Sequence, residues 1–308
     1  MPIKFAFYIK KSQPLSLETD KNGLFLNGTN GPLVILIHGL TGSPYETWYL
    51  AKFLNRKGYS VLCPRLANHG EPLEVLKKTT WQQCYQSVRE AFLAMKPTYE
   101  PGAIFASGLS VGALLALLLA DEFPDKIFGV SCLSPTLFYD GWNSTRFRHL
   151  LPLAYFTPLK NFFYFKEEPP YGIKNETIRQ RIHEFYNQAS LEDMKEVARY
   201  GYPFYPLTLL YQLHLLVKYF KKKLPQIQTP VQLIQAKEDD MTSVKNSQYI
   251  YDRIKSEKKE MFLLYDSYHV ITADQEKETV ARQMQRFFDE ISEDVRQKRK
   301  QQPCGLIS

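Results

Sequence analysis

The amino-acid sequence predicts an α/β fold with a mainly parallel central sheet and helices on both faces. Short apolar runs alternate with longer helical segments over much of the chain, which is typical of repeated βα units. A serine motif, an acidic motif and a histidine motif follow three of these runs, where the sites of parallel sheets lie. The 308 residues are enough to bury one large core.

The alternation is clearest in the first and last thirds of the chain. Two strands are expected at 3–9 and 24–26, before the first parallel strand. The elements that follow are expected as strand 33–37, helix 45–57, strand 59–63, helix 81–95, strand 103–107, helix 111–123, strand 128–133, strand 231–236, helix 243–256, strand 260–265 and helix 274–291.

An aromatic and proline-rich stretch, about 136–229, interrupts this alternation. We expect a core formed by 1–135 and 228–291, a cap over the site at 136–227, and a flexible basic tail at 292–308. The aromatic side chains of the cap have two interpretations, which can both hold for different residues. They line a lipophilic pocket, or they form a small core of the cap itself.

A Gly-x-Ser-x-Gly motif at 108–112 is the strongest chemical signal. It lies between a predicted strand and a predicted helix, so Gly108, Ser110 and Gly112 are expected to form a sharp elbow. Such a turn brings backbone segments too close for a Cβ atom, and it lifts the serine hydroxyl out of the sheet. We therefore predict Ser110 as a nucleophile.

A serine nucleophile needs a base, and His269 is the best placed histidine downstream. It follows the strand expected at 260–265 and precedes the last helix, as in folds with the chain order serine, acid, histidine. His183 and His214 fall in predicted helices, where surface or groove positions are expected.

The acid that orients this base should follow the strand expected at 231–236. Asp239 and Asp240 both do, and adjacent side chains cannot both point at one imidazole. The residues alone leave the choice open, and either aspartate is also suited to starting the turn before the next helix.

An oxyanion hole is expected from the backbone N–H groups of Leu40 and Val111. Leu40 follows the first parallel strand in a glycine-rich loop, and Val111 follows the nucleophile. His38 and His69 lie in neighbouring loops, where a structural role, bonded to backbone, is the favoured interpretation.

Four segments together resemble the small bacterial carboxylesterases related to monoacylglycerol lipases. These are His-Gly-Leu-Thr-Gly-Ser-Pro at 38–44, Gly-Leu-Ser-Val-Gly at 108–112, Gln-Ala-Lys-Glu-Asp-Asp-Met at 235–241 and Ser-Tyr-His-Val-Ile-Thr-Ala-Asp at 267–274. The resemblance implies an α/β-hydrolase fold, Asp239 as the acid and His269 as the base. Two features differ from the family: Tyr268 replaces a glycine, and the middle of the chain is longer.

The expected function is hydrolysis of lipophilic carboxylic esters through a Ser110–His269–Asp239 triad and an acyl-enzyme, without a metal or cofactor. The same triad also serves peptidases, thioesterases and acyltransferases. A peptidase acting on free amino termini needs an acidic anchor, for which Glu167 and Glu168 are candidates, although solvated surface charge is favoured. A non-catalytic binding protein on this fold is the remote alternative.

The net charge of +7 comes from 39 basic and 32 acidic residues. Basic residues cluster at 218–223 and 296–300, and their favoured interpretation is a solvated helix face and tail, with peripheral contact to anionic lipid as the alternative. No module for nucleic-acid binding accompanies them. The N-terminus has no secretory signal and the sequence no transmembrane segment, so we expect a cytoplasmic protein. Four unevenly spaced cysteines indicate neither disulfides nor a zinc site.

Overall fold

The computed structural model describes residues 23–99, 102–144, 151–188 and 197–301. The strands of the central sheet are β1 (Gly23–Leu26), β2 (Leu33–Ile37), β3 (Ser60–Pro64), β4 (Ile104–Leu109), β5 (Ile127–Leu133), β8 (Val231–Ala236) and β9 (Lys259–Leu264). They form a seven-stranded sheet in the order β1-β3-β2-β4-β5-β8-β9. Only β1 is antiparallel to its neighbour. The predicted mainly parallel sheet is therefore confirmed.

The inner strands are mostly apolar because both faces of the sheet are covered, although β4 contains Ser107 and β8 contains Gln232 and Gln235. All five residues of β2, Leu-Val-Ile-Leu-Ile, are buried, as is every residue of β4 and β8. A parallel strand that is buried on both faces has this composition, whereas a half-exposed strand alternates with polar residues. The predicted bounds of these strands agree with the structure to within two residues.

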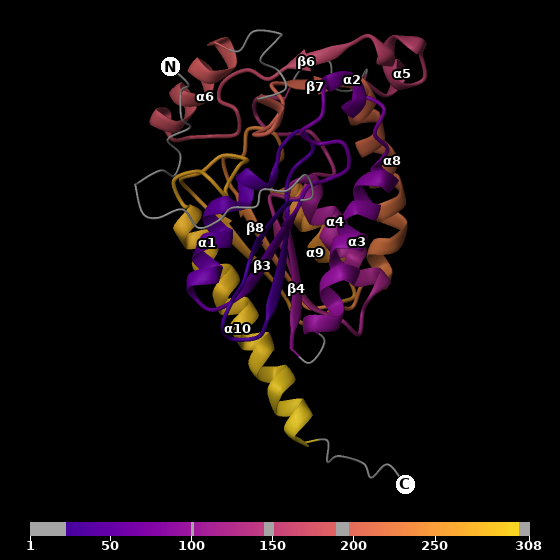
Figure 1. The fold of residues 1–308 in the computed structure, drawn as a ribbon. Coiled ribbons are helices and arrows are strands. Elements are labelled where there is room, and N and C mark those ends of the chain that lie inside the picture. Colours follow the sequence, from indigo (N-terminus) through magenta and orange to yellow (C-terminus); the bar gives the residue numbers. More distant parts are fainter. Residues whose placement is uncertain (1–22, 100–101, 145–150, 189–196, 302–308) are drawn as a thin grey trace.

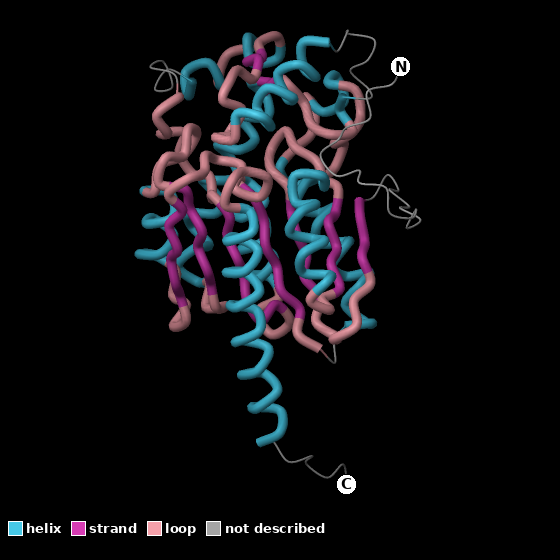
Figure 2. Tube along the Cα trace, turned by 90° about the vertical axis from the view of Figure 1, so that its left-hand side faces the viewer, coloured by secondary structure: helices cyan, strands magenta, loops and turns pink. Residues whose placement is uncertain are grey.

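Helices cover both faces of the sheet, as Figures 1 and 2 show. The larger helices are α1 (Trp48–Arg56), α3 (Trp81–Tyr99), α4 (Val111–Glu122), α8 (Leu207–Lys223), α9 (Lys245–Arg253) and α10 (Lys277–Gln301). One hydrophobic cluster joins α3, α4, α8 and α9 to the sheet. A second cluster joins α1 and α10 to it.

Smaller elements lie mostly over the end of the sheet at which β2, β4 and β8 finish (Figure 1). They are η1 (Pro44–Thr47), α2 (Leu73–Leu76), α5 (Leu151–Tyr155), η3 (Pro158–Asn161), β6 (Tyr164–Lys166), α6 (Glu176–Gln188), β7 (Phe204–Pro206) and, nearer the core, η4 (Leu224–Gln226). Strands β6 and β7 form a two-stranded antiparallel ribbon. The range 136–227 expected as a cap also contains α8, whose Leu213, Leu216 and Phe220 are buried in the same cluster as α3 and α4.

Helix α10 extends into the range 292–308, which the sequence predicts as a flexible tail. Helix α10 continues to Gln301, because Val295 still packs against the hydrophobic cluster of α1 and α10. Asp294 is also paired with Lys258 at 3.2 Å. The strand expected at 3–9 and the last residues of the tail lie outside the described residues.

Among the described residues, no helix has the length and apolarity needed to cross a bilayer. Cys63 in β3 and Cys132 in β5 are buried free thiols. They pack as small apolar side chains, as their positions in predicted strands indicate.

Candidate active site

Ser110 lies at the turn between β4 and α4 with a backbone φ of 58° and ψ of −115°. This positive φ is rare for a residue with a side chain and is held by the surrounding backbone. A Cβ on Gly108 would lie 2.2 Å from the backbone of Gly112, and one on Gly112 would lie 2.3 Å from the Ile37 carbonyl oxygen. The elbow therefore needs both glycines, as the motif predicts.

His269 and Asp239 come together from the loops that follow β9 and β8. The Nδ1 of His269 lies 2.9 Å from Asp239 Oδ2, and both side chains are buried. Asp239 also accepts hydrogen bonds from the backbone N–H of Thr242 at 2.7 Å and from Gln235 Nε2 at 2.7 Å. These donors fix the carboxylate so that both of its oxygens lie within 3.1 Å of His269 Nδ1.

Asp240 turns away from the imidazole ring and binds backbone instead. It accepts hydrogen bonds from the N–H groups of His269 and Gly172, each at 3.2 Å. Gly172 belongs to the segment between β6 and α6, so Asp240 ties the histidine loop to the layer above the sheet. The two adjacent aspartates thus hold different parts of His269, one the ring and the other the backbone.

The charge of Asp239 controls the protonation of His269. Burial alone lowers the pKa of this histidine, but the charge and hydrogen bond of Asp239 outweigh burial and raise the pKa above its usual 6.5. Burial raises the pKa of Asp240, although His269 acts in the opposite direction. The imidazolium form of His269 is therefore stabilised, as a general base requires once it has accepted a proton.

The hydroxyl of Ser110 is hydrogen-bonded to Thr136, with 2.7 Å between the two oxygens. Among the described residues it forms no hydrogen bond to His269, whose Nε2 has no partner there. Thr136 is fully buried and follows β5 by three residues. No motif in the sequence marks Thr136, because only its place just past a strand end links it to the site.

Leu40 and Val111 lie beside the elbow, and neither backbone N–H donates to another described residue. The loop of Leu40 is held by Glu46, whose Oε2 accepts a hydrogen bond of 2.8 Å from the N–H of Gly39. A Cβ on Gly42 would lie 2.1 Å from the same carboxyl group. Glu46 therefore packs closely on the turn that presents Leu40, a role the sequence analysis missed.

Two further histidines support this turn, in agreement with their predicted structural role. His38 donates from Nδ1 to the Gly39 carbonyl at 2.9 Å and accepts at Nε2 from the N–H of Leu66 at 3.1 Å. The Nε2 of His69 lies 2.8 Å from the Leu40 carbonyl oxygen. Both rings are buried, and burial lowers both pKa values. His183 and His214 are exposed, as expected.

Two carboxyl groups near His269, those of Glu46 and Glu167, have raised pKa values. Burial raises the pKa of Glu46 to about 7, and it raises that of Glu167 to about 8. Glu167 accepts a hydrogen bond of 3.1 Å from the hydroxyl of Tyr205 and interacts with Glu46, Asp240 and His269. Glu167 is half-buried and bonded to Tyr205, so it is not the freely solvated surface charge that the sequence favours, whereas Glu168 is exposed.

The aromatic side chains of the predicted cap divide into two groups. Tyr155 is buried and Tyr139 and Tyr205 are half-buried, and burial raises the pKa of all three. The strongly exposed members include Phe156 after α5, Phe162 and Phe163 after η3, and Tyr164 and Phe165 in β6. The two interpretations, a pocket lining and a small core of the cap, therefore concern the first group and stay predictions.

Taken together, the site holds a carboxylate–imidazole pair, a buried serine hydroxyl bonded to Thr136, and two backbone amides that have no partner among the described residues. This arrangement can move a proton between a hydroxyl and an imidazole and can bind a developing negative charge. In the part of the chain that the structure describes, no group of three or more His, Cys, Asp or Glu is suited to a metal ion.

Comparison with known families and sequences gives consistent matches. The family model described as serine aminopeptidase S33 matches residues 29–276. The thermostable monoacylglycerol lipase of Bacillus sp. strain H-257 is 30% identical over 264 residues, which cover 84% of this chain and 91% of the relative. The carboxylesterase of Bacillus subtilis strain 168 is 26% identical over 264 residues, with 84% and 92% covered.

Solved structures show the same fold. A structure from the study of the metagenome-derived lipolytic enzymes LipS and LipT matches with a TM-score of 0.70 and 25% identity, covering 87% of this chain and 96% of that one. The monoglyceride lipase of Saccharomyces cerevisiae matches with a TM-score of 0.69 and 17% identity over 87% of this chain and 91% of its own. The latter likeness concerns the fold alone.

Proposed function

This chain belongs to the serine aminopeptidase S33 family of α/β hydrolases and resembles carboxylesterases and monoacylglycerol lipases, and from that premise we propose that it hydrolyses carboxylic esters through a Ser110–His269–Asp239 triad. The observation that carries the proposal is the buried contact of 2.9 Å between His269 Nδ1 and Asp239, next to a serine held at positive φ in a glycine-flanked elbow.

The proposed reaction has two halves. In the first, Ser110 Oγ attacks the ester carbonyl while His269 Nε2 accepts its proton, and the alcohol then leaves with that proton as an acyl-enzyme forms. In the second, His269 activates a water molecule, which releases the acid and restores Ser110. The N–H groups of Leu40 and Val111 bind the oxyanion in both halves, and one such donor contributes about 3–4 kcal/mol.

The proposed substrates are lipophilic esters, which include monoacylglycerols. The support is the relatives named as lipases and the enclosed tyrosines above the sheet. Peripheral contact with a lipid surface is part of this proposal. Six large apolar side chains are exposed by 41–76% on the outer surface. They form the aromatic patch: Leu153, Phe156, Phe162, Phe163, Tyr164 and Phe165.

The charge around the aromatic patch suits such a surface. No Asp or Glu occurs from 141 to 166 in the sequence, and Phe and Tyr next to Lys160 and Lys166 are typical of an interfacial site. The basic clusters considered in the sequence analysis lie elsewhere. Helix α10 points away from β6 (Figure 1), and Lys223 is paired with Asp121 of α4 at 3.0 Å.

A second candidate function is hydrolysis of aminoacyl amides. It is favoured by Glu167, whose charge interacts with that of His269 and whose carboxyl group would anchor a substrate ammonium group. Turnover of amino acid p-nitroanilides compared with p-nitrophenyl esters distinguishes the two. We expect the esters to be turned over faster by at least roughly a hundredfold, which corresponds to about 2.7 kcal/mol in the barrier.

The proposed ester hydrolysis is tested with p-nitrophenyl esters and purified protein. We expect Ser110→Ala and His269→Ala each to lower kcat by at least roughly 10³-fold, in line with the loss of other triad members. Full activity of Ser110→Ala, with its fold intact by circular dichroism, would rule out the proposed nucleophile.

A further inference from the structure

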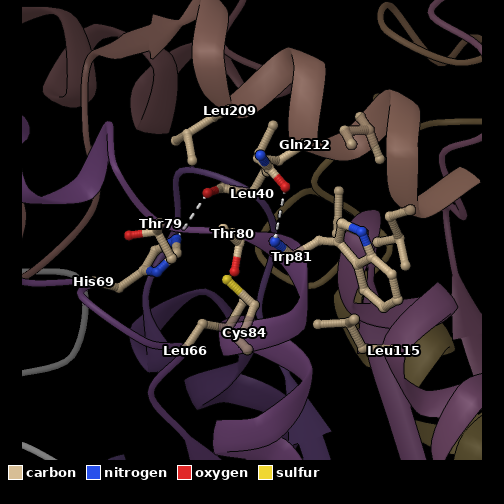
Figure 3. A pocket seen from close by; sticks show the side chains of 13 residues that line it. Leu40, Leu66, His69, Thr79, Thr80, Trp81, Cys84, Leu115, Leu209 and Gln212 are labelled. Atoms are coloured by element: carbon tan, nitrogen blue, oxygen red, sulfur yellow. Dashed lines mark hydrogen bonds between the residues drawn. The ribbon is translucent and has the colours of Figure 1, made fainter.

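The loop after β2 is held by side chains at three consecutive peptide groups. The N–H of Gly39 donates to Glu46 Oε2 at 2.8 Å, and the Gly39 carbonyl accepts from His38 Nδ1 at 2.9 Å. The next carbonyl, that of Leu40, lies 2.8 Å from His69 Nε2 (Figure 3). A peptide group is planar, so a bond to one of its ends fixes the direction of the other. The loop therefore has little freedom to turn its amides.

These contacts set the direction of the Leu40 N–H. This N–H belongs to the same trans peptide group as the Gly39 carbonyl, so it points away from the bond to His38. Among the described residues it has no hydrogen-bond partner. The other proposed donor, Val111, is the first residue of α4 and is oriented by the helix itself. Leu40 is therefore the donor whose direction depends on side-chain contacts.

The carboxyl group of Glu46 fills the inner side of this loop. A Cβ on Gly42 would lie 2.1 Å from its Cδ and from both of its oxygens. A Cβ on Gly39 would lie 3.3 Å from Oε2 of Glu46 and 3.7 Å from the Cβ of Ser110. The carboxyl group and the proposed nucleophile thus flank the same glycine. Its space exists only because positions 39 and 42 carry no side chain, so the carboxyl group and the two glycines fit as a set.

The electrostatics of Glu46 suit a position near developing negative charge. Burial raises its pKa to about 7, and the charge of His269 acts in the opposite direction. At neutral pH a large share of these carboxyl groups is therefore protonated and neutral. A neutral carboxyl group still accepts from the Gly39 N–H, and it places no full negative charge beside an oxyanion.

We propose that Glu46 is a positioning residue of the oxyanion hole, which holds the Gly39 peptide group so that the Leu40 N–H points at the carbonyl oxygen of the substrate. The inference rests on the proposed ester hydrolysis and adds the residue that orients one of its two donors. Glu46 acts through the backbone, because the N–H of Gly39 lies between it and Leu40. Loss of one oxyanion donor lowers kcat by about 10²–10³-fold, and a misdirected donor loses part of that contribution.

The test compares three substitutions, with p-nitrophenyl butanoate as the substrate. Glu46→Ala removes the acceptor and should lower kcat/KM by at least roughly 30-fold. Glu46→Gln keeps an oxygen for the Gly39 N–H and should stay within about fivefold of the wild type. The matched control is Glu122→Ala, which removes a carboxylate bonded to Arg89 at 2.6 Å at the far end of α4. The control should change kcat/KM by less than about twofold.

A trifluoromethyl ketone separates this role from a general loss of packing. Its adduct with Ser110 carries the oxyanion, so its Ki should rise in Glu46→Ala by the same factor by which kcat/KM falls. A purely structural role predicts a lower Tm without this proportionality. Glu46→Asp is too short to reach the Gly39 N–H and should behave like Glu46→Ala, so it decides the question if the alanine variant does not fold.

Gly42→Ala gives an independent test, because its Cβ takes the place of the Glu46 carboxyl group. Alone, it should lower kcat/KM about as much as Glu46→Ala does. In Glu46→Ala that space is empty, so the double variant should be no worse than the poorer single variant by more than about threefold. A double variant whose loss equals the product of the two single losses overturns the inference.

Ser110→Ala in the same assay separates the inference from the proposed function. If Ser110→Ala retains the rate, ester hydrolysis through Ser110 fails, and the role of Glu46 fails with it. If Ser110→Ala abolishes turnover but Glu46→Ala stays within about twofold of the wild type, the proposed function stands and the role of Glu46 is overturned. The same conclusion follows if Glu46→Ala loses activity while its Ki for the ketone is unchanged.

Discussion

Ser110 Oγ and Thr136 Oγ1 lie 2.7 Å apart, so the proposed nucleophile is hydrogen-bonded to a residue just past β5 rather than to His269. Either hydroxyl can be the donor. If Thr136 donates, it lowers the nucleophilicity of the serine oxygen. If Ser110 donates, the proton that His269 must receive points elsewhere.

In both cases, Thr136→Val should leave the hydroxyl of Ser110 without this bond, so that it can donate its proton to His269. Valine has nearly the same shape, and one hydrogen bond has a net value of about 1 kcal/mol. We therefore expect fluorophosphonate probes to label Ser110 up to about tenfold faster in Thr136→Val. Stopped-flow labelling would measure this, and slower labelling would show that Thr136 instead activates the serine.

The two adjacent aspartates should respond very differently to the same substitution. Asp239→Asn removes the charge next to His269 and should lower kcat by roughly 10⁴-fold, as the loss of a triad acid does elsewhere. The N–H groups of His269 and Gly172 donate to different oxygens of Asp240. Asp240→Asn therefore keeps one of these two hydrogen bonds and loses the other, and we expect a loss of less than about tenfold. Equal losses in the two variants would contradict the assignment of the acid.

The activity of the wild-type protein should rise with pH through a pKa above 6.5. Only neutral His269 can accept the proton of Ser110, and Asp239 raises the pKa of that histidine. Asp239→Asn removes the largest contribution that opposes burial, although Asp240 and Glu46 still raise the pKa of His269, so the same limb of residual activity should move to lower pH. The measurement is kcat/KM against pH for both proteins, and an unmoved or alkaline-shifted limb counts against the proposed coupling.

Glu46 should make stability depend on pH. Its pKa is about 7 in the folded protein, against 4.5 as the ordinary value, so the folded state favours its protonated form. The stability it contributes is complete below pH 4.5 and is lost as pH rises through about 7. Glu46→Gln keeps an acceptor for Gly39 without the charge, so its Tm should exceed that of the wild type at pH 8 by more than at pH 5. A difference that is the same at both pH values would exclude this origin.

Gly112→Ala should damage both the fold and the proposed site. The new Cβ would lie 2.3 Å from the Ile37 carbonyl oxygen, and forcing such contacts apart costs about 3 kcal/mol. The matched control is Gly31→Ala, where φ is also positive at 94° but no atom lies within 4 Å. We expect the control to lose only about 1 kcal/mol. Urea unfolding gives both values, and similar losses would mean that backbone strain outweighs the close approach.

The aromatic patch should bind lipid surfaces. Replacing both Phe162 and Phe163 by serine should reduce co-sedimentation with phosphatidylglycerol vesicles severalfold, because exposed aromatic rings enter the interface. The same change at Phe25, exposed by 42% on β1, should have no effect. If the double variant binds as well as the wild type, the patch does not contact the bilayer, and a dimer that dissociates on the same substitution would identify a second copy as its occupant.

Much of the fold could be predicted because the buried parallel strands are apolar along most of their length. β8 spans the predicted residues, and β2 does too. The elbow could also be predicted, since its glycines mark places where two backbone segments lie too close for a Cβ atom. Helix α10 was underestimated because its last turns are polar and show no clear apolar periodicity, although Val295 still packs on the core.

The remaining site residues depend on contacts between distant segments. Glu46 binds Gly39 across a turn, Glu167 meets Tyr205 from a neighbouring strand, and Thr136 meets Ser110 across two strand ends. A carboxylate in a polar stretch of sequence gives no sign that the fold will enclose it. Enclosure depends on how the upper layer packs, which no local pattern in the chain encodes.

The contact of Gly112 with the Ile37 carbonyl leaves no side chain between the end of β2 and the start of α4. The two loops that carry Leu40 and Val111 are thereby fixed to one another through backbone alone. Neither can be lengthened or reshaped during evolution without displacing the other. Exposed side chains in the layer above the sheet carry no such restriction, so descendants of this protein can change them while the backbone around Ser110 stays the same.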